Sequence, residues 1–297
     1  MASILDARTL PDGTTVSPDL CIIGGGPAGI SLALALKDTV FNILLLEAGG
    51  TEFDPKVQDA FKGSEEGDTP YLKLDESRLR RFGGSSNHWG GWSRPLDAID
   101  FEKRDGIPHS GWPFGIETLK PYFARAQALA EAGPWVYDQM PRRLGNDAVL
   151  PLGQGGVYTS WFQFSKTRGS DLPTSFGQRY QDDLKSASRI TTWLNAPVIA
   201  LRLSANAQRL ERLEVRADNK NLTIRPRFTV LAGGALENAR LLLAANDIMK
   251  SGIGNQNDLV GRFFADHPTP RDVATLVLFN SELPKGYFSG QNINNTV

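Results

Sequence analysis

Gly24, Gly26 and Gly29 form a G-x-G-x-x-G pattern whose spacing suits the binding of a diphosphate. The apolar run at 19–24 predicts a buried strand before the pattern, and the apolar residues at 30–37 predict a helix after it. In such a unit one glycine makes the tight turn, one lets a pyrophosphate approach the backbone, and one lets helix and strand pack closely. The N–H groups at the helix start attract phosphate oxygens. The pattern therefore predicts a dinucleotide site.

An acidic residue follows at the position expected for binding a ribose. The run FNILLLE at 41–47 predicts a second buried strand, and Glu47 ends it 18 residues after Gly29. A carboxylate there accepts hydrogen bonds from ribose hydroxyls and repels a 2′-phosphate, which argues against NADP. On these residues alone both FAD and NAD remain open.

A second glycine-rich stretch, RRFGGSSNHWGGWSRP at 80–95, surrounds His88 with four glycines. Ordering so much glycine costs conformational entropy, so we expect a ligand to bind against this backbone.

Composition narrows the class of protein. The 297 residues carry a net charge of −1, which gives no electrostatic reason to expect nucleic acid or an anionic membrane as a partner. The single cysteine, Cys21, excludes an intramolecular disulfide and a thiolate metal cluster, so no metal site is predicted. Neither a bilayer-spanning run nor a secretory signal is evident, and a cytoplasmic location is expected.

Further elements follow from the apolar patterns. FTVLAGG at 228–234 predicts a third strand, and 235–246 a helix in which Glu237 and Asn238 have the alternative role of capping. A helix is predicted at 118–132, ended by Gly133-Pro134. Alternating residues at 190–204 and 209–217 predict antiparallel strands, and 271–280 a further strand. The fold class is α/β.

Several motifs in order give the chain a resemblance to a known family. They are IIGGGPAGISLALAL with LLLEAGG, RRFGGSSNHWGGWSRP, SGWPFGIETLKPYFARA, VLAGGALENARLLL and LVGRFFADHP. Together they resemble the glucose–methanol–choline oxidoreductases, most nearly the sugar-oxidising branch that includes pyranose 2-oxidase. The resemblance implies FAD as cofactor and oxidation of CH–OH groups of sugars or other alcohols by hydride transfer to flavin N5. It also implies a Rossmann-like FAD-binding domain with an incomplete antiparallel-sheet substrate domain.

The resemblance also implies roles for individual residues. The backbone at Gly83 and Gly84 would lie beside the pyrophosphate and the flavin. Asn87 and His88 would lie beside the isoalloxazine ring. His88 is a candidate for a covalent bond to the flavin methyl group, with simple packing as the alternative. Two further cofactor contacts are expected: the backbone at Val198, beside the adenine, and the close approach at Gly233. His267 is expected to be structural.

The implied organisation has four segments. These are a first FAD-binding segment at 15–105, a substrate-side or lid insertion at 106–189, a second FAD-binding segment at 190–262, and the start of a substrate domain at 263–297.

No catalytic residue is predicted. In the family a histidine near the C-terminus, with a partner histidine or asparagine, removes the alcohol proton, and no histidine here matches that base. The chain is therefore expected to be truncated before the base. Two alternatives stay open, namely a non-catalytic FAD-binding half that needs a partner chain and an NAD-linked dehydrogenase. The electron acceptor is equally open among oxygen, a quinone and others.

Overall fold

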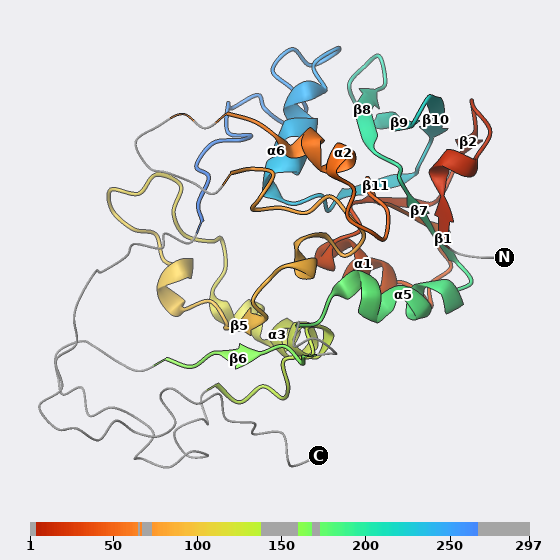
Figure 1. Cartoon of the computed structure of the whole chain (residues 1–297). Coiled ribbons are helices and arrows are strands. Elements are labelled where there is room, and N and C mark those ends of the chain that lie inside the picture. Colours follow the sequence, from red (N-terminus) through yellow and green to blue (C-terminus); the bar gives the residue numbers. More distant parts are fainter. Residues whose placement is uncertain (1–3, 65, 67–72, 138–159, 168–172, 267–297) are drawn as a thin grey trace, which may run out of the picture. The chain divides into compact units, whose positions relative to one another are not determined.

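The computed structural model describes residues 4–64, 66, 73–137, 160–167 and 173–266 (Figure 1). The chain forms two units, one made of 1–90 with 172–264 and the other of 91–171 with 265–297. The strand predicted at 271–280 and His267 lie outside the described residues. The four-segment division by function stays a prediction, because these units are defined by contacts and not by ligands.

A parallel sheet lies at the centre of the first unit (Figure 1). Its five strands run in the order β1 (Ile4–Asp6), β7 (Ile190–Leu194), β4 (Ile43–Leu46), β3 (Leu20–Ile23) and β11 (Phe228–Leu231), and every neighbouring pair is parallel. Every residue of β3 and β4 is buried, as expected of continuous apolar strands covered on both faces. The predicted α/β class and these three apolar strands, β3, β4 and β11, are confirmed.

Helices cover one face of this sheet. Helix α1 (Pro27–Ala35) follows β3 directly, as predicted, and packs beside α5 (Phe176–Ser186), which also contacts β7 (Figure 1). Buried Ile30 of α1 and Tyr180 and Leu184 of α5 supply apolar side chains. Helix α6 (Ala235–Ala244) follows β11, also as predicted, and contacts the second sheet through β8.

The second sheet of the first unit closes the core on the opposite side. Its order is β2 (Thr15–Val16), β10 (Lys220–Ile224), β9 (Leu210–Ala217) and β8 (Val198–Leu203). One buried cluster joins Cys21, Leu44 and Trp193 of the parallel sheet to Leu213 and Leu222 of this sheet. The β8–β9 and β9–β10 pairs are antiparallel, which confirms the prediction for 198–203 and 209–217.

The prediction was wrong for ITTWL at 190–194. These residues form β7, which pairs in parallel with both β4 and β1. The two threonines suggested one solvated face, yet Thr192 is fully buried between strands and only Thr191 is partly exposed. Threonine is tolerated there because its β-branched shape suits a strand.

The second unit is described in part. Strand β5 (Trp92–Ser93) pairs antiparallel with β6 (Gln163–Phe164), and the Trp92 ring lies 5.3 Å from that of Phe164. Helix α3 (Lys120–Leu129) confirms the helix predicted at 118–132 but ends earlier, because Glu131 takes a left-handed φ of 51°. The short helices of both units are η1 (Ala7–Thr9), α2 (Pro55–Gln58), η2 (Asp59–Phe61), η3 (Gly84–Asn87), η4 (Ala98–Phe101) and η5 (Ile116–Thr118).

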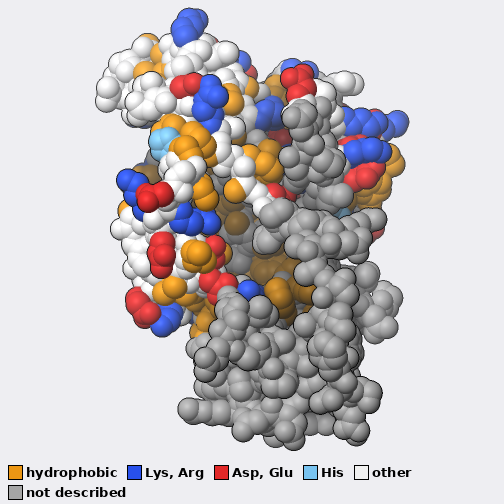
Figure 2. Space-filling model, turned by 90° about the vertical axis from the view of Figure 1, so that its left-hand side faces the viewer, with side chains coloured by type: hydrophobic (Ala, Val, Ile, Leu, Met, Phe, Trp, Pro, Cys, Tyr) orange, Lys and Arg blue, Asp and Glu red, His pale blue; other side chains and the backbone are white. Residues whose placement is uncertain are grey.

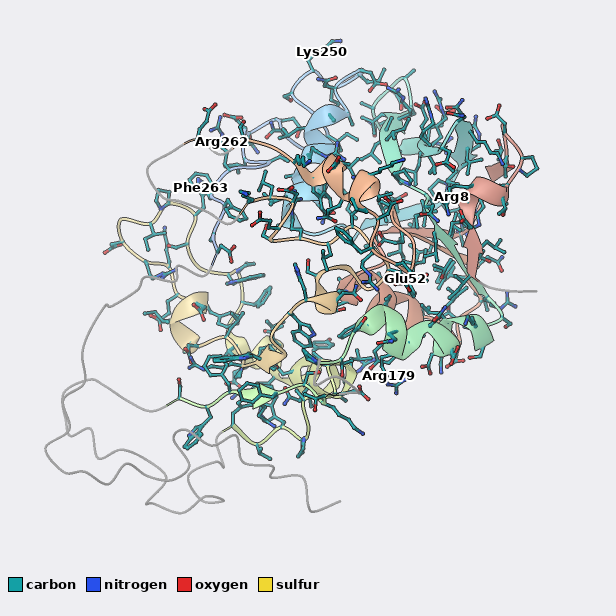
Figure 3. The ribbon with its side chains drawn as sticks, in the orientation of Figure 1. Arg8, Glu52, Arg179, Lys250, Arg262 and Phe263 are labelled. Carbon is teal, nitrogen blue, oxygen red and sulfur yellow. The ribbon has the colours of Figure 1, made fainter. Side chains whose placement is uncertain are left out.

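Charged side chains lie at the periphery of the first unit, among them Arg8, Arg179 and Lys250 (Figure 3). Of the helices in the described ranges, none has both the length and the apolar character that crossing a bilayer requires.

Candidate functional site

A cavity of about 600 Å³ opens in the first unit at the carboxyl ends of β3, β4 and β11. Its size falls in the range of small-molecule and cofactor sites, roughly 300–1,000 Å³. Strand β3 lies between β4 and β11. The turn after β3 leads into α1, which packs on this sheet, and the turn after β11 leads into α6, which contacts the second sheet. Ligands of open α/β sheets bind at the carboxyl ends of neighbouring strands whose connections diverge in this way. Six of the sequence-predicted site residues line the cavity: Gly24, Gly26, Glu47, Gly84, Val198 and Gly233.

The turn after β3 needs glycine at two places for reasons internal to the chain. Gly24 has a φ of 116°, and a Cβ on it would lie 2.4 Å from the carbonyl oxygen of Ala232. A Cβ on Gly29 would lie 1.9 Å from the carbonyl oxygen of Gly24, so α1 rests directly on the turn. Gly29 does not line the cavity; it lets helix and strand pack closely.

Gly26 is different, because no described residue occupies the space above it. A Cβ there would meet only the Cα of Gly84, at 4.0 Å. Gly26 caps α1, offers no side chain to the first-turn N–H groups, and lines the cavity. The geometry leaves bare backbone and uncapped amides facing open volume, which is the arrangement that an anion at a helix N-terminus uses.

Glu47 is held rigidly at the edge of the cavity. Its side chain is buried, with 6 % of the residue exposed. The N–H of Gly25 donates to Oε2 at 2.9 Å and the N–H of Gly49 donates to Oε1 at 2.8 Å. Burial raises the pKa of Glu47, and these N–H groups oppose that shift. Each oxygen keeps a second lone pair that a ligand hydroxyl can use.

The second glycine-rich stretch docks on the first. The N–H of Gly83 donates to the carbonyl of Gly25 at 2.8 Å, and the Asn87 amide donates to the carbonyl of Gly84 at 2.7 Å. A Cβ on Gly83 would lie 2.7 Å from the backbone nitrogen of Gly177, at the start of α5. Gly83 is therefore needed for packing, whereas Gly84 lies at the cavity.

Three residues predicted near the flavin, Gly83, Asn87 and His88, do not line this cavity. Asn87 is engaged in the loop itself, where it also accepts a hydrogen bond from Ser175 Oγ at 2.7 Å. The His88 side chain lies at the surface, and partial burial of the imidazole lowers its pKa against the effect of a backbone hydrogen bond with Ser77. Their roles beside a flavin stay predictions.

The turn after β11 forms the opposite wall. Asn238 Oδ1 accepts from the N–H of Gly233 at 3.0 Å, and Asn238 Nδ2 donates to the carbonyl of Leu231 at 3.2 Å. Glu237 does not serve as a helix cap. Its carboxylate forms ion pairs with Arg78 at 3.1 Å and Arg240 at 2.8 Å, with 13 % of the side chain exposed.

Sequence reasoning missed Phe61, Arg78 and Arg80, which also line the cavity. The Arg78 guanidinium lies 4.1 Å from the centre of the Phe61 ring, and that of Arg80 lies 5.3 Å from it. These residues fall in the stretch 50–80, which has no periodicity. The one signal available was the pair of arginines at 80 and 81, immediately before the glycine loop.

Comparison with known proteins places these features in context. No protein-family profile matches the chain. A 2-methyl-1,2-propanediol dehydrogenase from Mycolicibacterium austroafricanum is 25 % identical, over 84 % of this chain and 55 % of that protein. A pyridoxine 4-oxidase from Microbacterium luteolum is 26 % identical, over 81 % of this chain and 53 % of that protein. The chain spans about half the length of these relatives.

Solved structures show the same fold. Pyridoxine 4-oxidase from Mesorbium loti superposes with a TM-score of 0.51 at 20 % identity, covering 77 % of this chain and 52 % of that one. A formate oxidase superposes with a TM-score of 0.53 at 17 % identity, covering 80 % and 48 %.

The first unit is an α/β unit with a Rossmann-like parallel sheet, and it shares this fold with the two solved structures. The relatives are glucose–methanol–choline oxidoreductases, so the family resemblance carried by the sequence motifs is confirmed. The narrower resemblance to the sugar-oxidising branch stays a prediction.

Proposed function

We propose that this chain binds FAD in the cavity and forms the cofactor-binding part of an oxidoreductase that acts on CH–OH groups of sugars or other alcohols. The observation that carries the proposal is the open space over the backbone of Gly26, with Gly84 in contact with it, at the uncapped start of α1. The names of the two relatives, a 2-methyl-1,2-propanediol dehydrogenase and a pyridoxine 4-oxidase, support the same class of reaction.

The diphosphate of the cofactor would lie over Gly26. The first-turn N–H groups of α1 point toward the cavity edge without a side-chain cap, and the positive end of the helix dipole favours an anion there. Gly84 would border the same group next to Gly26, since a Cβ on Gly84 would lie 3.1 Å from the Cα of Gly26 and the two residues are in contact.

The adenosine would lie between the ends of β4 and β8. Glu47 is fixed by two backbone N–H groups, so its carboxylate accepts ribose hydroxyls without first being ordered. Val198, buried at the start of β8, would present its backbone to the adenine. A 2′-phosphate would meet the Glu47 carboxylate, which disfavours NADP.

FAD supplies a hydride acceptor at flavin N5 when bound. This chain would hold the isoalloxazine next to the loop that follows Gly84, where Asn87 and His88 lie. Hydrogen bonds from Asn87 to the carbonyls of Phe82 and Gly84 fix that loop. We assign no proton-removing base and no electron acceptor to residues of this chain.

Identification of the bound cofactor tests the proposal. The full 297-residue chain would be purified, denatured, and its released small molecules separated by chromatography with FAD, FMN and NAD standards. We expect FAD. NAD in its place would favour the NAD-linked dehydrogenase. Absence of a dinucleotide among the released molecules, together with absence of flavin fluorescence on the denatured polypeptide, would contradict the proposal. FAD with no turnover of alcohols or aldoses, using a dye acceptor, would favour a binding half that needs a partner chain.

A further inference from the structure

The cavity carries an unequal set of charges. Three arginines line it, Arg78, Arg80 and Arg240, against the carboxylates of Glu47 and Glu237. Glu237 is fully engaged, because Oε1 pairs with Arg78 at 3.1 Å and Oε2 pairs with Arg240 at 2.8 Å. Arg240 also reaches solvent, with 52 % of its side chain exposed. Among the described residues that line the cavity, one cation therefore lacks a matching carboxylate.

Arg80 is that cation. In the part of the chain that the structure describes, its guanidinium has no hydrogen bond or ion pair, and its contact is the face of the Phe61 ring at 5.3 Å. Both Glu47 oxygens accept backbone N–H groups instead. Burial lowers the pKa of Arg80, but from so high an ordinary value that the group stays protonated at neutral pH.

The backbone holds Arg80 in place. Its N–H donates to Gln58 Oε1 at 2.9 Å, and a Cβ on Gly49 would lie 2.1 Å from its carbonyl oxygen. Gly49 lies two residues after Glu47, which itself directly follows the last residue of β4. The contact with Gly49 therefore anchors Arg80 next to the carboxyl end of β4, where Glu47 lies. A partly buried cation held against a cavity without an anionic partner is costly unless an anion enters.

We propose that Arg80 is the counter-charge for the diphosphate of the dinucleotide bound in this cavity, with the Phe61 ring supporting its guanidinium. The inference rests on the proposed function, since it requires a dinucleotide there. A planar guanidinium makes paired, charge-assisted hydrogen bonds to phosphate oxygens. The competing interpretation is that Arg80 stacks on the adenine. The two interpretations differ in which ligands would lose affinity when the side chain is removed.

The test compares ADP with adenosine, which share the base and ribose but differ in the diphosphate. Titration calorimetry on the full chain, stripped of bound nucleotide, would use wild type, Arg80→Gln and Arg80→Lys. We expect Arg80→Gln to weaken ADP and FAD by about 10- to 100-fold and adenosine by less than about 3-fold. Arg80→Lys should lie between, because it keeps the charge but loses the fork geometry.

A matched control separates the site from general charge loss. Arg209→Gln removes a cation from the exposed β8–β9 turn, in the same unit and away from the cavity lining, and should leave ADP binding unchanged. Raising the salt concentration should weaken ADP binding to wild type more than to Arg80→Gln.

Two results would overturn the inference. Unchanged ADP affinity in Arg80→Gln would show that the guanidinium does not meet the diphosphate. Equal losses for adenosine and ADP would show that it acts on the adenine or on the shape of the cavity. If wild type itself bound neither ADP nor FAD, the proposed function would fail together with the inference, whereas FAD binding unaffected by Arg80→Gln would remove the inference alone.

Discussion

Three glycines of one motif meet different requirements at the scale of single residues. Gly24 and Gly29 are demanded by contacts within the protein, since added Cβ atoms would lie 2.4 Å and 1.9 Å from backbone oxygens. Gly26 faces a cavity, and its nearest neighbour would be 4.0 Å away. The same residue type therefore serves folding at two positions and, on our proposal, ligand binding at the third.

This difference predicts opposite behaviour for two alanine variants. Gly29→Ala should destabilise the flavin-free protein by about 3 kcal/mol or more, because the clash overpacks the contact between helix and strand. Gly26→Ala should cost less than about 1 kcal/mol in stability, yet weaken FAD at least about 10-fold, because the methyl group fills the space for the diphosphate. Urea unfolding and FAD titration measure the two effects separately.

The contrast itself is the check. Flavin-free Gly26→Ala protein that unfolds as readily as Gly29→Ala would mean that the protein, and not a ligand, requires glycine at position 26.

Glu47 predicts a pH dependence of stability. Burial raises its pKa in the folded protein above the ordinary value of 4.5. Between those two values the folded state binds more protons than the unfolded state, so this group makes stability fall as the pH rises through that window. Glu47→Gln should flatten that part of the curve in flavin-free protein. Urea unfolding measured from pH 4 to pH 8 in both proteins gives the comparison; parallel curves would contradict the assignment.

The roles of the motif residues in the site could be predicted from the sequence, because these residues lie close together along the chain. One strand–turn–helix–strand unit contains all of these residues, namely Gly24, Gly26, Gly29 and Glu47. Their spacing in the sequence therefore determines their relative positions in the folded protein. The role of Arg80 could not be predicted. Its guanidinium has no carboxylate partner among the described residues, and this depends on where Glu237, from a distant segment, directs its two oxygens.

At the scale of elements, an ion-pair network joins the segment before the glycine loop to α6. Glu237 accepts from Arg78 and from Arg240, and Arg78 also donates to the carbonyl of Leu74 at 3.1 Å. Since Glu237 and Arg78 are largely shielded, the network fixes one wall of the cavity against another.

Removing the shared carboxylate should therefore destabilise the protein. Glu237→Gln leaves two guanidinium groups facing each other and should lower the free energy of unfolding by about 2 kcal/mol. Glu211→Gln, which breaks the exposed pair of Glu211 with Arg225 at 3.3 Å, is the control and should change it by less than about 1 kcal/mol. Similar losses in both variants would mean that the network contributes no more than a surface pair.

Elements with a continuous apolar run or a clear turn were predictable, and those set by distant pairing were not. Strands β3 and β4 and helix α1 follow from local pattern. Strand β7 was predicted wrongly because its threonines produce an apparent alternation of polar and apolar residues. Only its pairing with β4 and β1 shows that it lies inside the parallel sheet. Strands β1 and β2 are 3 and 2 residues long, too short for a pattern to predict.

At the scale of the whole molecule, the described surface carries charges of both signs close together, as Figure 2 shows for the face it presents. With a net charge of −1, the chain has no overall field that would by itself draw an anionic ligand. Attraction of a dinucleotide must then come from local groups, the α1 terminus and Arg80.

Ligand linkage predicts a thermal shift for the whole chain. At FAD concentrations of about 100 times Kd, binding to the folded state alone adds about 2.7 kcal/mol of stability. For a chain of this size that raises Tm by about 4 °C. Thermal melts with and without FAD measure the shift, and Gly26→Val should abolish it. A shift of equal size in Gly26→Val would mean that FAD binds elsewhere.

The most direct measurement is a crystal structure of the chain soaked with FAD. The account predicts that the diphosphate lies over Gly26 at the start of α1, bordered by Gly84, with ribose hydroxyls at Glu47 and the Arg80 guanidinium turned to a phosphate oxygen. A diphosphate located away from the start of α1, or a cavity left empty at saturating FAD, would contradict it.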